Sequence, residues 1–224
     1  MIKAFIFDLF ETLITEWGHE KYTKRKMSED LHLDYDLFNQ YWEENEYGRY
    51  HGSISFEDSI RYVCSKCGVT LLPQTLAHMI TRRMETKAAC FDCIDPDIIA
   101  LLQSLKSKGM RLAMLSNCSS EEVTAIRQSD VSSFFDTVVL SYEVGLSKPD
   151  PLIYRKVLGE LQLSAEQCLF VGDGGSNELA GAHAVGLHAV QAKWYTNRHD
   201  VPRGSMEGFE TAGRPLDLMR FMIV

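Results

Sequence analysis

The sequence lacks several features that mark particular classes of protein. It has no long run of lysine or arginine, and 31 acidic residues outnumber 23 basic ones, for a formal net charge of -8. This balance argues against nucleic acid or an anionic membrane as the main partner. No apolar stretch approaches the length of a membrane-spanning helix. Neither an internal repeat nor a low-complexity linker divides the 224 residues.

Targeting signals and disulfides are not expected either. Met1-Ile2-Lys3 leads into an apolar run that is too short for a signal peptide, so we expect a cytoplasmic protein. Its six cysteines should then stay reduced. Two Cys-x-x-Cys pairs have a spacing that can hold zinc, but the first lies at the end of an expected helix, where such residues share one face. We favour ordinary packing for both pairs, Cys64/Cys67 and Cys90/Cys93.

What is present suits a globular protein. The chain is 45% apolar and 24% charged, and its length allows one or two domains with a sizeable core. Residues 17–88 are rich in charge, and their apolar residues recur with the period of a helix. No strong strand pattern interrupts them, so we expect an all-helical insert there. Three helices are expected in this insert, at residues 34–45, 55–68 and 74–87, with residues 47–52 as a loop.

The rest of the chain alternates between strands and helices. Strands are expected at residues 2–7, 111–115, 137–140, 168–171 and 188–191, with helices between them. Such alternation predicts a doubly wound, parallel, Rossmann-like α/β sheet. The predicted organisation is therefore an α/β core of residues 1–16 and 89–224, interrupted by a helical domain of residues 17–88.

Polar side chains follow the ends of these strands. Since parallel strands gather their carboxyl ends at one edge of a sheet, we expect Asp8, Ser116, Asn117 and Asp173 to meet there. Lys148 precedes a helix, and Glu178 follows a flexible Gly174-Gly175-Ser176 turn. Several carboxylates together suggest a hard divalent cation such as Mg²⁺. With a lysine and hydroxyl and amide donors, the set could bind a phosphoryl group and attack it.

Four segments resemble the four ordered motifs of the haloacid dehalogenase superfamily. They are Phe7-Asp8-Leu9-Phe10-Glu11-Thr12-Leu13, Leu115-Ser116-Asn117, Lys148-Pro149-Asp150-Pro151 and the stretch from Val171 to Ala182 that contains Gly172-Asp173 and Glu178. Their order, spacing and strand-tip context agree with that family over nearly the whole chain. The helical insert directly after the first motif resembles the family's helical cap.

The resemblance implies a role for each of these residues. Asp8 would be the covalent nucleophile of a hydrolase, and Thr12 would order its loop. Mg²⁺ would be held by Asp8, the Phe10 carbonyl and Asp173, with Glu178 supporting it through water. Phosphoryl oxygens would be held by Ser116, Asn117 and Lys148.

Phe10 departs from the pattern of similar phosphatases, which carry a second aspartate at this position for proton transfer. Phenylalanine cannot move a proton. Three functions stay open: a Mg²⁺-dependent phosphatase, which we favour; a 2-haloacid dehalogenase, which Phe10 and the Lys148/Tyr154 pair would suit; and a phospho-ligand-binding or regulatory protein with little turnover. Asp173 and Glu178 favour the first, because they and Asp8 would repel one another without a cation.

The expected partner is a small phosphorylated molecule. Arg49 and His51 in the expected loop at residues 47–52 are predicted to contact it, since such loops face the active site in capped proteins of this kind. We expect a monomer or a homodimer.

Overall fold

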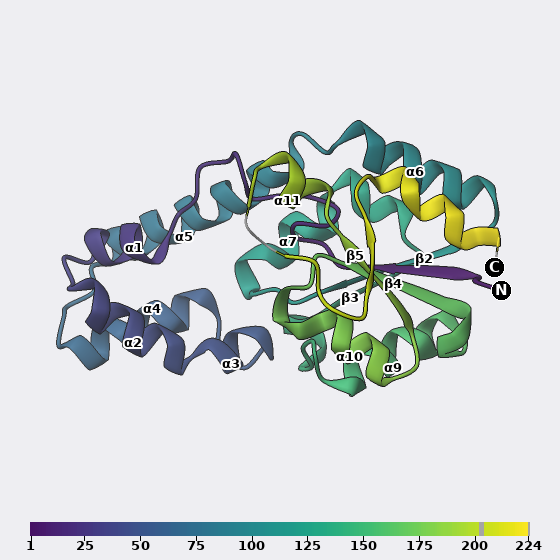
Figure 1. Cartoon of the computed structure of the whole chain (residues 1–224). Coiled ribbons are helices and arrows are strands. Elements are labelled where there is room, and N and C mark those ends of the chain that lie inside the picture. Colours follow the sequence, from purple (N-terminus) through teal and green to yellow (C-terminus); the bar gives the residue numbers. More distant parts are fainter. Residues whose placement is uncertain (202–203, 224) are drawn as a thin grey trace.

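The computed structural model describes residues 1–201 and 204–223, and its centre is a parallel six-stranded sheet (Figure 1). The strand order is β3-β2-β1-β4-β5-β6, and every neighbouring pair is parallel. This confirms the predicted doubly wound fold. The strands are β1 (Ala4–Phe7), β2 (Arg111–Ser116), β3 (Thr137–Leu140), β4 (Cys168–Gly172), β5 (His188–Ala192) and β6 (Glu210–Ala212).

The central strand β1 is buried on both faces, as its continuous apolar run predicts. Its side chains alternate between two apolar clusters, with Phe5 and Phe7 in one and Ala4 and Ile6 in the other. Helix α6 (Pro96–Ser107) contributes to the first cluster. The second is built against α9 (Pro151–Leu161) and α10 (Glu178–Ala184), so helices cover both faces of the sheet.

Shorter elements connect these layers. Helix α7 (Ser120–Gln128) begins at the predicted capping box of Ser119 and Glu122. The others in the core are α8 (Ser141–Val144), α11 (Trp194–Arg198) and the 3₁₀ helices η1 (Ala89–Phe91), η2 (Asp130–Phe134), η3 (Ala165–Gln167), η4 (Gly175–Asn177) and η5 (Pro215–Ile223).

The helical insert, residues 17–88, lies to one side of the sheet in Figure 1 and returns to it through α5. It buries an apolar cluster of its own, whose largest members include Phe38, Trp42, Ile60 and Met79. The three predicted helices are present there. The insert contains α1 (Lys24–Asp30), α2 (Tyr35–Glu44), α3 (Glu46–Tyr50), α4 (Phe56–Cys67) and α5 (Pro73–Ala88).

Some predicted details were wrong or incomplete. The segment expected to be a loop at residues 47–52 begins as helix α3, because Gly48 is there for close packing rather than for a turn. A Cβ at Gly48 would lie 2.7 Å from the Ile54 side chain. Strand β6 was not predicted, and the helix expected before the fourth strand begins at Pro151, after the N-cap Asp150.

The four paired cysteines are spread over different parts of the structure. Cys64 packs in the insert's apolar cluster and Cys90 in the cluster beside α6. Cys67 is half-buried and Cys93 exposed. These positions suit packing, as predicted. None of the helices in the described ranges has both the length and the apolar character needed to cross a bilayer.

Candidate active site

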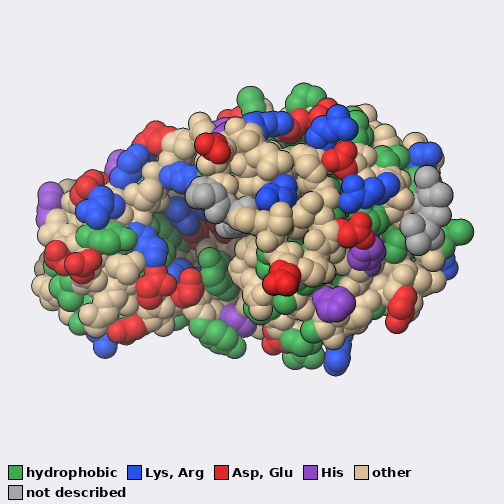
Figure 2. All heavy atoms as spheres, viewed as in Figure 1, with side chains coloured by type: hydrophobic (Ala, Val, Ile, Leu, Met, Phe, Trp, Pro, Cys, Tyr) green, Lys and Arg blue, Asp and Glu red, His purple; other side chains and the backbone are tan. Residues whose placement is uncertain are grey.

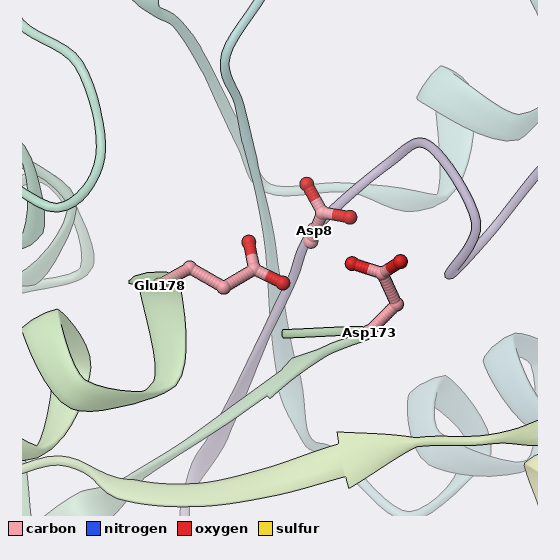
Figure 3. A group of neighbouring side chains, drawn as sticks. All are labelled: Asp8, Asp173 and Glu178. Atoms are coloured by element: carbon pink, nitrogen blue, oxygen red, sulfur yellow. The ribbon is translucent and has the colours of Figure 1, made fainter. Parts of the chain in front are cut away.

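Three carboxylates converge at the carboxyl edge of the sheet. Asp8 follows β1, Asp173 follows β4 and Glu178 opens α10, and their side chains point toward one another (Figure 3). One oxygen from each lies within 4.8 Å of the others, and the three residues are only 6%, 4% and 1% exposed. They form the only acidic, histidine or cysteine group among the described residues with a geometry that could hold a metal.

The turn between β4 and α10 brings Glu178 back to Asp173. Gly174, Ser176 and Asn177 all have positive φ angles, of 97°, 50° and 53°. The reversed backbone lets the Gly174 N–H donate to Glu178 Oε1 at 3.1 Å. A Cβ at Gly172 would lie 2.1 Å from that oxygen, so glycine leaves the space that the carboxylate occupies.

Lys148 lies between two of these carboxylates. Its Nζ donates to Asp8 Oδ1 at 2.5 Å and to Glu178 Oε2 at 2.6 Å, and the residue is 4% exposed. Burial opposes its charge, but Asp8 and Glu178 outweigh burial, so the pKa of Lys148 lies above its ordinary value. Burial and then Asp8 raise the pKa of Glu178 to about 7, against the lowering effect of Lys148.

Three buried carboxylates converge at this point of the site. Asp8, Asp173 and Glu178 supply oxygen ligands, which are those that Mg²⁺ prefers, and a divalent cation would offset their repulsion. The residues present therefore fit a magnesium ion.

The other predicted polar residues hold this arrangement in place. Thr12 Oγ1 donates to Asp8 Oδ2 at 3.0 Å. The Asn117 amide donates to the Lys148 carbonyl at 2.9 Å and accepts from the Lys148 N–H at 2.8 Å, which fixes the lysine loop. Ser116 is fully buried, and its hydroxyl donates to the Asn117 carbonyl at 3.2 Å. Their predicted contacts with a phosphoryl group stay predictions.

A cavity of about 250 Å³ opens above the carboxylates, between the insert and the core. It is lined by Asp8, Phe10, Asn117, Lys148, Asp173 and Glu178, together with residues from the insert. A second cavity of about 250 Å³ shares Glu16, Tyr50, Arg83 and Ser119 with it and extends farther into the insert. Figure 2 shows the molecule hollowed between the two parts, with acidic and basic side chains in the hollow.

Phe10 lines the first cavity. The Lys87 ammonium lies 4.7 Å from the centre of this ring, within the range of a cation–π contact. Phe10 therefore contributes an apolar side chain to the cavity, with the Lys87 ammonium beside it. It offers no group that transfers a proton.

A second set of buried charges at this cavity was not predicted. Lys87 is bonded to Glu16 at 2.5 Å and Glu122 at 2.6 Å, and Arg83 to Glu121 at 3.0 Å. These pairs join helix α5 of the insert to α7 of the core and to the segment after the first motif. Arg83 and Lys87 lie one turn apart on an expected helix, and this spacing was the one signal that could have revealed them.

The two residues predicted to contact substrate lie in different surroundings. Arg49 is 5% exposed and lines the second cavity. His51 is half-buried, stacks on Tyr47, and its Nε2 lies 3.3 Å from Ser147 Oγ of the core. His51 lines neither cavity, so the structure brings it to the rim and Arg49 to the interior.

The loop after Asp8 is anchored by α11. Trp194 Nε1 donates to the Thr12 carbonyl at 2.9 Å, and the Tyr195 hydroxyl donates to the Leu13 carbonyl at 3.2 Å. Both aromatic residues are buried, so they pack behind the site, as expected for core residues.

Comparison with known proteins identifies a family model that matches residues 2–186, described as haloacid dehalogenase-like hydrolase. Among curated proteins, a glyceraldehyde 3-phosphate phosphatase of Methanopyrus kandleri is 26% identical over 199 residues, which cover 86% of this chain and 84% of that protein. A phosphoserine phosphatase of Thermus thermophilus is 30% identical over 96 residues, or 42% of this chain and 39% of that protein.

Solved structures share the fold at low identity. A 2-haloacid dehalogenase from Pseudomonas syringae superposes with a TM-score of 0.72 at 16% identity, over 100% of this chain and 99% of that one. A HAD phosphatase from Thermococcus onnurineus superposes with a TM-score of 0.67 at 19% identity, over 99% and 98%. Dehalogenases and phosphatases thus share this architecture, and the fold alone does not separate the two activities.

Proposed function

The chain belongs to the haloacid dehalogenase-like hydrolases, and from that premise we propose that it is a Mg²⁺-dependent phosphatase of a small phosphorylated metabolite. The convergence of Asp8, Asp173 and Glu178, two of which contact Lys148, carries this proposal. Converging carboxylate oxygens favour a hard divalent cation, and such a cation together with Lys148 favours a phosphoryl group.

The metal would be held by Asp8, Asp173 and the Phe10 carbonyl, with Glu178 supporting it through water. When bound, Mg²⁺ screens the charge of the phosphoryl oxygens so that an anionic nucleophile can approach. The same cation would offset the repulsion among the three converging carboxylates.

The chain's own residues supply the rest. Asp8 attacks phosphorus with one carboxylate oxygen and forms an aspartyl-phosphate as the P–O bond to the leaving group breaks. The leaving oxygen departs as an anion and takes its proton from water, and a second water then hydrolyses the aspartyl-phosphate to phosphate and free Asp8. The hydroxyl of Thr12 holds the other oxygen of Asp8 in place. Lys148, fixed by Asn117, neutralises phosphoryl charge, and Ser116 and Asn117 complete the phosphoryl site in this assignment.

The helical insert is assigned the role of a cap that covers the cavity and selects the leaving group, with Arg49 and His51 among its contacts. Because Phe10 transfers no proton, substrates whose leaving groups need little protonation should react best. Curated relatives named as phosphatases of glyceraldehyde 3-phosphate and phosphoserine support a small phosphomonoester as substrate.

A dehalogenase is the second candidate, favoured by Phe10 two residues after the nucleophile. Halide leaves without a proton, so an apolar ring there costs nothing. Against it, Asp173 and Glu178 are both present beside Asp8. The Tyr154 hydroxyl donates to the Glu178 carbonyl at 2.9 Å, and Tyr154 lines neither cavity.

Phosphate release from an aryl phosphate, measured with and without Mg²⁺, tests the proposal. We expect turnover that needs Mg²⁺ and falls by at least about 10³-fold in Asp8→Asn, because the nucleophile is lost. Asp92→Asn, at an exposed position, is the matched control. Metal-independent halide release from 2-chloropropionate would favour the dehalogenase. Tight binding of a phosphorylated ligand without any turnover would favour a regulatory protein.

A further inference from the structure

The cationic side chains that line the two cavities differ in whether they form ion pairs. Six lysine and arginine side chains line the cavities, and five have a carboxylate within 4.0 Å. Arg49 is the sixth, and none of the described residues offers it an ion pair. The paired cations are Lys21, Lys24, Arg83, Lys87 and Lys148.

Arg49 is nevertheless buried, at 5% exposed. Its guanidinium lies over the Trp42 ring, 3.9 Å from the ring centre, and one terminal nitrogen donates to the Trp42 carbonyl at 2.6 Å. Its other N–H groups have no described partner. They are not sealed off, because Asn45 Nδ2 is the only described side-chain atom that is both buried and unbonded. These donors therefore open onto the cavity that Arg49 lines.

A buried cation without an ion pair carries a desolvation cost. Burial lowers the pKa of Arg49 below its ordinary value, although Tyr50, Glu46, Glu43 and Glu121 act in the other direction. The guanidinium is held over the Trp42 ring, and its remaining N–H groups are not sealed off. This is a preformed fork for a planar or tetrahedral anion.

The position of Arg49 connects it to the catalytic end. The next residue, Tyr50, lines both cavities. A ligand attached at Asp8 can thus extend past Tyr50 and reach Arg49 without leaving the cleft. The cations on the way, Arg83 and Lys87, are occupied by glutamates and offer no binding site for a further anion.

We propose that Arg49 binds a second anionic group, a carboxylate or a phosphate, at the far end of the leaving group. The inference rests on the proposed phosphatase activity and narrows its substrate to phosphomonoesters that carry two separated anionic groups. Arg49 acts as a specificity-determining residue, and the phosphoryl group bound at Asp8 is the one transferred.

Three matched series of esters test this inference. Each has an alkyl chain of about two to six carbons, which cavities of this size can hold, and one phosphate ester. The other end carries a hydroxyl, a carboxylate or a second phosphate. We expect kcat/KM for one of the anionic series to exceed that of the hydroxyl series by about tenfold or more at the best length. The better anionic series identifies the terminal group.

Variants of Arg49 assign the preference to this side chain. Arg49→Gln should lower kcat/KM for the anionic esters about 100-fold more than for the hydroxyl esters, because a desolvated charge pair is lost. Arg49→Lys keeps the charge but not the fork and should fall between. Arg61→Gln is the matched control, since Arg61 is exposed, paired with Glu57 and outside both cavities. Thermal unfolding confirms that each variant is folded.

Two results would overturn the inference while leaving the phosphatase intact. One is equal kcat/KM for hydroxyl and anionic esters at every length. The other is an equal loss for all three series in Arg49→Gln. If no ester is hydrolysed, the phosphatase proposal fails instead. Calorimetry with Asp8→Asn in Mg²⁺ then decides: tighter binding of anionic esters that disappears with Arg49→Gln supports the inference, and equal affinities reject it.

Discussion

Two buried lysines face the same cavity, and each lies between two carboxylates. Lys148 contacts Asp8 and Glu178 at the strand ends, whereas Lys87 contacts Glu16 and Glu122 where the insert meets the core. Similar local geometry occurs in both places. What differs is how the carboxylates around each lysine are arranged.

The carboxylates converge in the Lys148 group and are distributed in ion pairs in the Lys87 group. Asp173 brings a third carboxylate oxygen within 4.8 Å of those of Asp8 and Glu178. Around Lys87, the acids Glu16, Glu121 and Glu122 pair with Lys87, Arg83 and, at 4.0 Å from Glu16, Lys21. Converging carboxylate oxygens indicate a place for a cation, and charges distributed in pairs indicate a structural joint.

Replacing the two lysines in turn gives the strongest test of this difference. Lys148→Met should lower phosphatase kcat/KM by about 10³-fold, because charge stabilisation at the phosphoryl group is lost. Mg²⁺ should also raise the melting temperature of this variant more than that of the wild type, since Asp8 and Glu178 are left without their cation. Activity close to wild type would show that the Lys148 group is structural as well.

Lys87→Met should affect stability instead. Removing this cation leaves Glu16 and Glu122 uncompensated, and breaking a buried pair in this way costs about 3–5 kcal/mol of the free energy of unfolding. Turnover by the folded fraction should change by less than about tenfold. Urea unfolding and activity at low temperature measure the two effects. Lys106→Met removes an exposed pair with Asp136 and serves as control, at about 0–1 kcal/mol. A catalytic loss at unchanged stability would contradict the comparison.

Phe10→Asp tests both groups at once, because position 10 contacts Lys87 and lines the same cavity as Asp8. A carboxylate there should raise phosphatase kcat about 10- to 100-fold if proton transfer is what the site lacks. The gain in kcat should stay below that of an ideally tuned general acid, since Lys87 would hold the new carboxylate in its charged form. Phe10→Asn controls for the loss of the ring. An equal effect of both changes would exclude proton transfer as the missing step.

The smallest expected effect is a pH dependence of the Lys87 group. Burial opposes the charge of Glu16, but Lys87 outweighs burial, and the pKa of Glu16 lies below its ordinary value. Its contribution to stability is therefore complete above the ordinary glutamate pKa and is lost as pH falls through the lowered one. The free energy of unfolding, measured in urea between about pH 3 and 6, should depend less steeply on pH in Glu16→Gln than in the wild type. Identical slopes would contradict the assignment.

Local sequence signals predicted much of the fold. The five predicted strands and the three predicted helices of the insert depend on patterns among neighbouring residues, and all are present. Strand β6 has three residues at the sheet edge and is too short for a period to be detected. Gly48 suggested a turn, although its role is to let Ile54 approach, which only the tertiary structure reveals.

The site was predictable where chain topology determines it. Parallel strands bring Asp8 and Asp173 to one edge in any sheet of this kind. The contacts that bind distant segments were not predictable, because no local pattern records them. Asn117 lies 31 residues from the Lys148 backbone that its amide holds, and Lys87 lies 71 residues from Glu16.

The Lys87 group also determines how the insert can move. Glu16 lies on the segment that leaves the core and Lys87 on the helix that returns to it, so the pair ties both connections to α7. Beside His51 the insert meets the core through weaker contacts: His51 Nε2 lies 3.3 Å from Ser147 Oγ, and the Gly52 backbone packs against the Tyr142 carbonyl. A rotation of the insert about the Lys87 group would open the cleft beside His51. Such an opening would break these weaker contacts and keep the buried ion pairs.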